Sequence, residues 1–296
     1  FLLIFLSCSE NANNNNYDFQ VNDAQVVFVV EDDLWNSTID SLVKTTFSQK
    51  IEGLLKNEPM FFVVQTNNTD QLPSLLKSNK NVVSVIIITQ DPKVLDKKNS
   101  SALNEFVTEI YWQNNSEKLV DQLLELRSQI VLNELASIKK EFAKLSQTKI
   151  ETEIAANFNI DVVVPKHYQI LKNEKNFFWG NYDPQDRDEI KNIFIFSFPR
   201  SSKYDQNQLL HKTDSIFAKY LVGEEEGTYA KIETEIPIYN HENLYRGVWT
   251  LEGGFMGGVF IIKVYHLKNK TVVNIGFVFA PQNSKRKYIK EFEAIL

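Results

Sequence analysis

Two pairs of glycines lie close together near the end of the chain, in the segment GGFMGG at residues 253–258. Glycine adopts backbone dihedrals that other residues avoid, so such pairs permit either a close approach of backbone to a ligand or a tight turn between strands. No Gly-Lys-Ser/Thr ending and no helix pattern follow, which excludes a phosphate-binding loop. The pattern favours the turn, and Met256, Gly257 and Gly258 are kept as candidate ligand contacts.

Arg246 and Trp249 precede this segment in a strand pattern. Because they are three residues apart, their side chains point to opposite faces of the strand. Trp249 is expected in the core. Arg246 is expected either to pair with a carboxylate, for which residues 224–226 supply three glutamates, or to bind an anionic ligand, and the ion pair is favoured.

A basic cluster opens the last predicted helix and consists of Lys285, Arg286, Lys287 and Lys290. Cations at the start of a helix oppose its macrodipole, so an anionic partner such as a lipid headgroup or a phosphate would stabilise them. The alternative is a solvated face paired with Glu291 and Glu293, and this is favoured because exposed charge runs usually serve solubility. Lys285 and Arg286 complete the set of candidate ligand-binding residues.

Most site chemistries lack support in the sequence. The four histidines are His167, His211, His241 and His266. None has the spacing of a zinc site, and no G-x-S-x-G segment indicates a serine hydrolase. Asp183, Asp186 and Asp188 resemble a calcium loop only superficially. A glycosidase carboxylate pair, which is defined in space, stays open without positive support. We therefore expect no metal, no cofactor and no identifiable catalytic residue.

The chain begins with an apolar run, FLLIFL, followed by Ser7 and Cys8. The run is too short to cross a bilayer and is typical of the end of a signal peptide. A small residue before Cys resembles a bacterial lipobox, so Cys8 is the expected site of lipidation. The Asn-rich residues 9–22 cannot bury enough surface to fold and are interpreted as a tether.

Composition restricts the class of protein. The 296 residues are 43% apolar and 24% charged, which suits one or two globular domains. The net charge of −6 argues against a general nucleic-acid binder. Cys8 is the only cysteine, so no disulfide can form within the chain.

Periodicity divides the rest of the chain into two halves. In the first, strands are predicted at 25–30, 61–66, 82–89 and 108–113, a helix over 34–55, and a short helical link at 73–78. A long helix is predicted over 117–147. The second half carries predicted strands at 160–164, 176–182, 192–198, 228–236, 244–251, 258–267 and 271–280, with helices over 206–221 and 285–296.

This pattern predicts an α+β fold: two mixed or antiparallel sheet layers covered by helices, with the halves joined by one long helix. The expected segments are a signal segment at 1–8, the tether at 9–22, a first half at 23–115, the long helix at 116–150 and a second half at 151–296.

The segment RGVWTLEGGFMGGVF at 246–260 and the final FVFAPQNSKRKYIKEFEAIL resemble an uncharacterised lipoprotein family of Bacteroidetes-type bacteria, domain of unknown function 4837. NEPMF at 57–61, NFFWGNY at 176–182 and GTYAKIETE at 227–235 agree with it, so the resemblance covers nearly the whole mature chain. Val259 departs from the family's usual Pro after Met-Gly-Gly. The resemblance implies an envelope location and no assigned activity.

The sequence thus predicts a cell-envelope protein held to a membrane, expected to be the outer membrane, by a lipid. A non-enzymatic component that binds an envelope protein, a glycan or an anionic lipid is favoured. The alternative is a hydrolase-like enzyme acting on an envelope polymer, with Arg246, Asp214 or acidic residues in a cleft of the second half. Convergence of the glycine-rich segment and the basic cluster on one pocket would separate these hypotheses.

Overall fold

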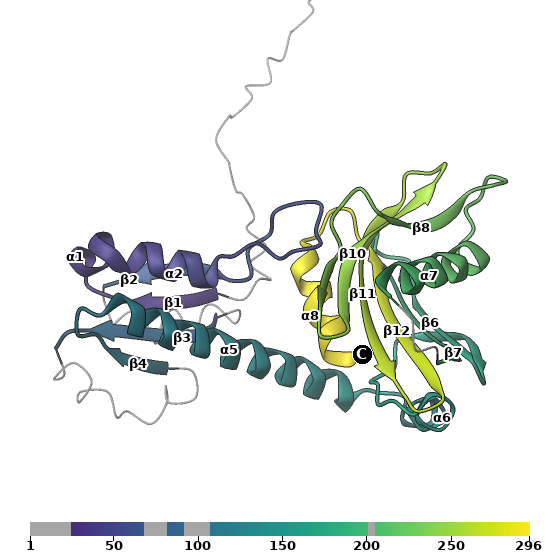
Figure 1. Cartoon of the computed structure of the whole chain (residues 1–296), viewed down its shortest axis with the longest axis horizontal. Coiled ribbons are helices and arrows are strands. Elements are labelled where there is room, and N and C mark those ends of the chain that lie inside the picture. The colour runs from purple at the N-terminus through teal and green to yellow at the C-terminus, as the bar shows by residue number, and fades with distance from the viewer. Residues whose placement is uncertain (1–24, 68–81, 92–106, 201–204) are drawn as a thin grey trace, which may run out of the picture.

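The computed structural model describes residues 25–67, 82–91, 107–200 and 205–296. It contains two halves, each built on one sheet and joined by a long helix (Figure 1). The α+β class is confirmed. Cys8, the predicted tether and the predicted helical link at 73–78 lie outside the described residues.

The first half contains a four-stranded sheet of order β2-β1-β3-β4. Its strands are β1 (Gln25–Val29), β2 (Phe62–Thr66), β3 (Val82–Thr89) and β4 (Val107–Tyr111). All three pairings are parallel, where the sequence had suggested mixed or antiparallel pairing. Parallel neighbours need long crossovers and leave strands buried on both faces, which explains the unbroken apolar run of β1.

The helical run after β1 comprises α1 (Asp32–Leu34), a π-helical turn (Trp35–Ile39) and α2 (Asp40–Phe47). The predicted continuation to residue 55 is wrong. The chain instead doubles back, with Met60 N donating to Gln49 O at 2.7 Å and Ile51 N to Glu58 O at 2.8 Å. Residues 48–60 are here named the clamp loop. Ile51 of this loop is apolar because it packs in the core of the second half, not because it belongs to a helix.

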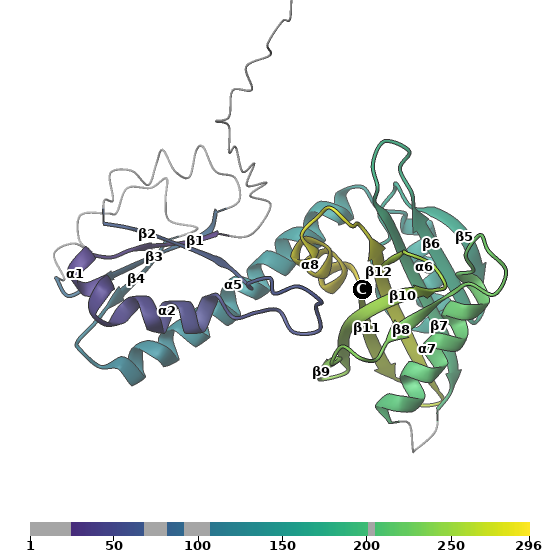
Figure 2. The ribbon, with the colours of Figure 1, turned by 90° about the horizontal axis from the view of Figure 1, so that it is seen from above.

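The long helix α5 (Ser116–Lys144) belongs to both cores. Asn115 caps it by accepting from Lys118 N, and its 29 residues span about 44 Å. Leu119 and Leu123 pack against the first sheet, whereas Phe142 packs in the core of the second half. Figures 1 and 2 show α5 running from the first sheet to the side of the C-terminal helix.

The segment after α5 differs from its prediction. The long helix ends at Lys144, and a separate helix, α6 (Thr148–Phe158), follows it. Residues 160–164, predicted as a strand, form no strand. They are largely buried, and Val163 N donates to Ile295 O while Val164 N donates to Glu151 Oε1. These residues are apolar because they pack against helices in the core, not because they pair with a neighbouring strand.

The second half contains an eight-stranded antiparallel sheet of order β5-β6-β7-β12-β11-β10-β8, with β9 also paired to β10. The strands are β5 (Gln169–Glu174), β6 (Phe177–Tyr182), β7 (Ile190–Pro199), β8 (Tyr229–Glu233), β9 (Tyr239–His241), β10 (Leu244–Glu252), β11 (Gly257–His266) and β12 (Lys270–Phe279). The predicted β11–β12 hairpin is confirmed.

Two helices cover opposite faces of this sheet. α7 (Gln206–Tyr220) packs on one face through Phe217, and α8 (Lys285–Ile295) packs on the other through Ile289 and Phe292. The C-terminus, at the end of α8, lies between this helix and the strands of the second sheet (Figure 1). In the described ranges, no helix has the length and apolar character needed to cross a bilayer.

The clamp loop generates the first prediction. Gly53 has φ of 81°, and a Cβ added there would lie 2.5 Å from Arg246 O in the second half. Gly227 has φ of 85° with nothing within 4 Å of such a Cβ. Gly227→Ala should therefore lose about 1–2 kcal/mol from the dihedral alone. Gly53→Ala should lose about 1–3 kcal/mol more because backbone must also move.

Urea unfolding of the two variants measures this difference directly. Equal losses would show that the clamp loop is free to move away from β10.

Candidate ligand-binding cavity

A cavity of about 770 Å³ lies where the two halves meet. This volume is in the range of small-molecule sites. Three segments line it: residues 55–59 of the clamp loop with Phe62, the β10–β11 hairpin, and the chain from Phe279 into the start of α8. The glycine-rich segment and the basic cluster therefore do converge on one cavity.

The glycines at the hairpin serve the turn and tight packing. Gly253 has φ of 72°, in the left-handed region that favours glycine. Gly258 pairs with Trp249 at the start of β11, and a Cβ on it would lie 1.8 Å from Val278 O. No side chain fits there without moving β12, so the hairpin backbone forms a close-packed wall of the cavity.

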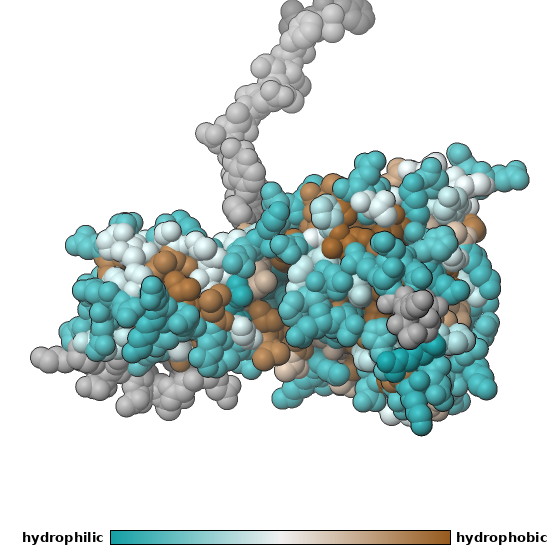
Figure 3. Space-filling view, viewed as in Figure 1, coloured by the Kyte–Doolittle hydropathy of each residue, from teal (hydrophilic) through white to brown (hydrophobic). Residues whose placement is uncertain are grey.

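The rim of the cavity is apolar and exposed. Leu55 is 72% exposed, Phe62 38% and Phe255 93%. Figure 3 shows hydrophobic surface at the upper part of the second half and at the junction of the halves, on a mostly hydrophilic molecule. Large apolar side chains gathered around a hollow are typical of interaction sites.

Glu58 closes the end of the cavity next to α8. Its carboxylate accepts from the backbone N–H groups of Lys285 and Arg286 at 2.8–2.9 Å and from Ser284 Oγ at 2.8 Å. A carboxylate at a helix N-terminus satisfies unpaired N–H groups and complements the macrodipole. The anionic partner that the start of this helix favours is thus a side chain of the first half.

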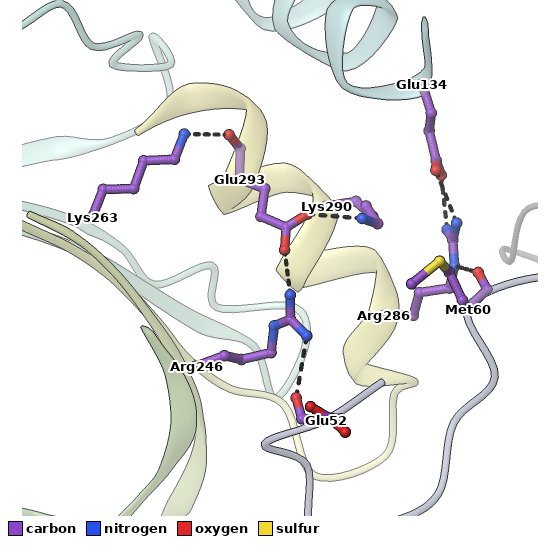
Figure 4. Close-up of polar contacts among 8 residues, drawn as sticks. All are labelled: Glu52, Met60, Glu134, Arg246, Lys263, Arg286, Lys290 and Glu293. Atoms are coloured by element: carbon purple, nitrogen blue, oxygen red, sulfur yellow. Dashed lines mark hydrogen bonds and ion pairs between the residues drawn. The ribbon is translucent and has the colours of Figure 1, made fainter. Parts of the chain in front are cut away.

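Arg286 is paired and only 2% exposed. Its two terminal nitrogens donate to the two oxygens of Glu134 at 2.8 and 2.9 Å, and its Nε donates to Met60 O (Figure 4). Its guanidinium also lies over the ring of Phe61. The solvated face predicted for the basic cluster is therefore wrong at Arg286. At Lys290 only the predicted exposure is wrong: the side chain is buried, but it donates to Glu293 at 2.7 Å, as the predicted pairing requires.

Arg246 pairs with Glu293 at 2.6 Å and donates to Glu52 O at 3.1 Å (Figure 4). The partner expected among residues 224–226 is wrong, because α8 rather than that loop lies over this face of β10. Burial pushes the pKa of Glu293 upward, but Lys290 and Arg246 outweigh it and hold the pKa below its usual value.

Trp249 lies on the opposite face from Arg246, in the core beneath α7, as predicted. Its Nε1 donates to Val278 O at 3.2 Å. The residues of the candidate set that line the cavity are Trp249, Met256, Gly257, Gly258, Lys285 and Arg286. Arg246 does not line it.

Comparison with known families divides the chain near α6. Residues 146–296 match the family described as domain of unknown function DUF4837. The chain belongs to this family. Residues 22–158 match a second domain of unknown function, DUF8532. The DUF4837 match therefore covers the second half of the chain, whereas the resemblance had suggested nearly the whole chain. No curated protein matches the chain.

The cavity needs residues from both matched regions. The clamp loop and Phe62 come from the DUF8532 region, and the hairpin and the start of α8 come from the DUF4837 region. The exposed rim residues and Glu58 were missed as site residues from sequence. Glu58 lies in the segment NEPMF, which contributed only to the family resemblance. No local pattern around Glu58 indicates that it binds the start of α8, 227 residues further along the chain.

Lys285 lines the cavity and keeps one hydrogen-bond donor without a partner among the described residues. Its Nζ donates to Ala280 O at 2.6 Å and to Asn283 O at 2.5 Å. Burial lowers its pKa, Glu58 partly offsets this, and nearby Lys56 lowers the pKa further.

Other polar groups of the DUF4837 region serve the fold. Asp214, a candidate for the enzyme hypothesis, accepts from Ile232 N at 2.6 Å and ties α7 to β8, and burial raises its pKa. Asp183, Asp186 and Asp188 line an open surface hollow of about 570 Å³. Among the described residues, no three His, Cys, Asp or Glu side chains gather as a metal site would require.

The second prediction concerns the pairing across the halves. Glu134→Gln should destabilise the protein by about 3 kcal/mol or more, because it leaves the Arg286 cation buried without a counter-charge. Glu141→Gln is the matched control on the same helix: the Glu141 side chain is 66% exposed, and within the described part of the chain its ion-pair partner is the exposed Lys144 alone. It should change stability by less than about 0.5 kcal/mol.

Chemical denaturation of both variants tests this. Similar small losses would mean that the Arg286–Glu134 contact contributes little.

Proposed function

We propose that the chain is a lipid-anchored protein of the bacterial cell envelope that binds a ligand in the cavity between its halves and does not catalyse a reaction. The proposal rests on two features of the cavity. Its rim is apolar and exposed, and the acidic side chains at and beside it already form hydrogen bonds and ion pairs within the protein. Ligand sites are mostly apolar clefts with a few polar groups, which this cavity resembles.

The acidic groups at and beside the cavity support binding over catalysis. Glu58 uses its carboxylate at the start of α8, and Glu134 uses both oxygens on Arg286. A general acid or base must be within hydrogen-bond reach of a substrate and free to exchange a proton. Neither glutamate meets this condition without breaking the contact between the halves.

The alternative of an envelope-polymer enzyme gains no comparable support. Of its candidates, Arg246 and Asp214 line none of the described cavities, and each is held by partners within the fold. Among the acidic residues, Asp183, Asp186 and Asp188 line a separate open hollow rather than the cavity between the halves.

A neutral apolar dye tests binding in the cavity. Nile red should gain fluorescence with the protein, and Leu55→Ser should lower its affinity about threefold or more because apolar rim surface is lost. Leu132→Ser is the matched control, since Leu132 is 66% exposed on α5 and does not line the cavity. A fluorescence titration in which the two variants behave alike would contradict the proposed site.

The membrane anchor is supported by the order of apolar run, Ser7, Cys8 and Asn-rich segment. Metabolic labelling with a clickable palmitate analogue should label the precursor in a Bacteroidetes-type host, and Cys8→Ala should abolish the label. A label equal in both forms, or absent from both, would contradict lipidation at this cysteine.

A further inference from the structure

Two lysines at the cavity carry charge that the fold does not neutralise with an ion pair. Among the described residues, Lys56 is exposed and has neither an ion-pair nor a hydrogen-bond partner, and Lys285 has no ion pair within 4 Å. An ammonium has three donors, and Lys285 uses two of them on carbonyl oxygens. One donor of Lys285 and all three of Lys56 are therefore available to a ligand.

The other positive features of the cavity wall are occupied. Glu58 fills the anion position at the start of α8, and Glu134 neutralises Arg286. An incoming anion therefore meets the two lysines rather than the helix N-terminus or the guanidinium. Lys56 and Lys285 line the same cavity, so one negative group there can lie near both ammonium groups.

We infer that the cavity takes an amphipathic anion, with an alkyl chain against the apolar rim and a carboxylate or phosphate between Lys56 and Lys285. This inference rests on the proposed function of the cavity. A glycan fits less well, because the cavity surface is mostly apolar and includes the exposed side chains of Leu55, Phe62 and Phe255. A purely apolar ligand would bury Lys285 further without adding a charge to offset the desolvation of its ammonium group, which is unfavourable.

Isothermal titration of the full chain with matched dodecyl compounds tests the inference. Laurate and dodecyl phosphate should each bind about tenfold or more tightly than dodecanol, since each adds charge-assisted hydrogen bonds to the same chain. The tighter of the two anions identifies the headgroup chemistry. Inorganic phosphate alone should bind far more weakly than dodecyl phosphate, because it lacks the alkyl chain.

Variants of the lysines give the second arm. Lys56→Gln and Lys285→Gln should bring the affinity for laurate toward that for dodecanol. Lys212→Gln, an exposed lysine on α7, is the matched control and should change nothing. If Lys285→Gln disturbs the fold, as judged by circular dichroism, Lys56→Gln decides alone, because among the described residues Lys56 has no hydrogen-bond or ion-pair partner whose loss could unfold the protein.

The outcomes separate the inference from the proposed function. Dodecanol binding as tightly as laurate, or affinities unaffected by the lysine variants, would overturn the anionic headgroup while leaving an apolar cavity site in place. Inorganic phosphate binding as tightly as dodecyl phosphate would also overturn the amphiphile. Failure of all dodecyl compounds together with Nile red would overturn both.

Discussion

The structure depends on neutralising the charges of α8, a cationic helix that packs between the second sheet, α5 and the clamp loop. Burying an unpaired cation is costly, so each buried cation on or beside this helix requires a fixed counter-charge. Arg286 receives it from Glu134 on α5, and Arg246 and Lys290 share Glu293. The helix N-terminus receives it from Glu58. Two of these carboxylates come from residues before α6, so the pairing fixes how the halves meet.

The cavity follows from this constraint. To place Glu58 at the start of α8, the clamp loop must leave the first sheet and cross to the second half, which it does as a narrow excursion with Gly53 against Arg246 O. The same excursion carries Leu55 and Lys56 past the core and leaves them at the surface. The contact that joins the halves therefore also supplies one wall of the site, with apolar and cationic groups side by side.

Local signals predicted much of this fold and little of the contact between halves. Strong periodicity placed α5, α7 and α8, and β-branched runs placed the first four strands to within a residue or two. Parallel pairing was not predictable because neighbouring strands are set by crossovers rather than by local pattern. Arg127 and Glu134 are charged residues within α5 whose partners no local pattern indicates. They bind the clamp loop and Arg286, partners that are 78 and 152 residues distant.

Because neither matched region contains the whole cavity, ligand binding and the docking of the halves are thermodynamically linked. A ligand that contacts the clamp loop and the β10–β11 hairpin binds only the docked arrangement, and it stabilises that arrangement by an amount set by its affinity and concentration. The charges of α8 already favour docking through Glu58 and Glu134, which keeps the site formed before the ligand arrives. Such preorganisation reduces the ordering cost of binding.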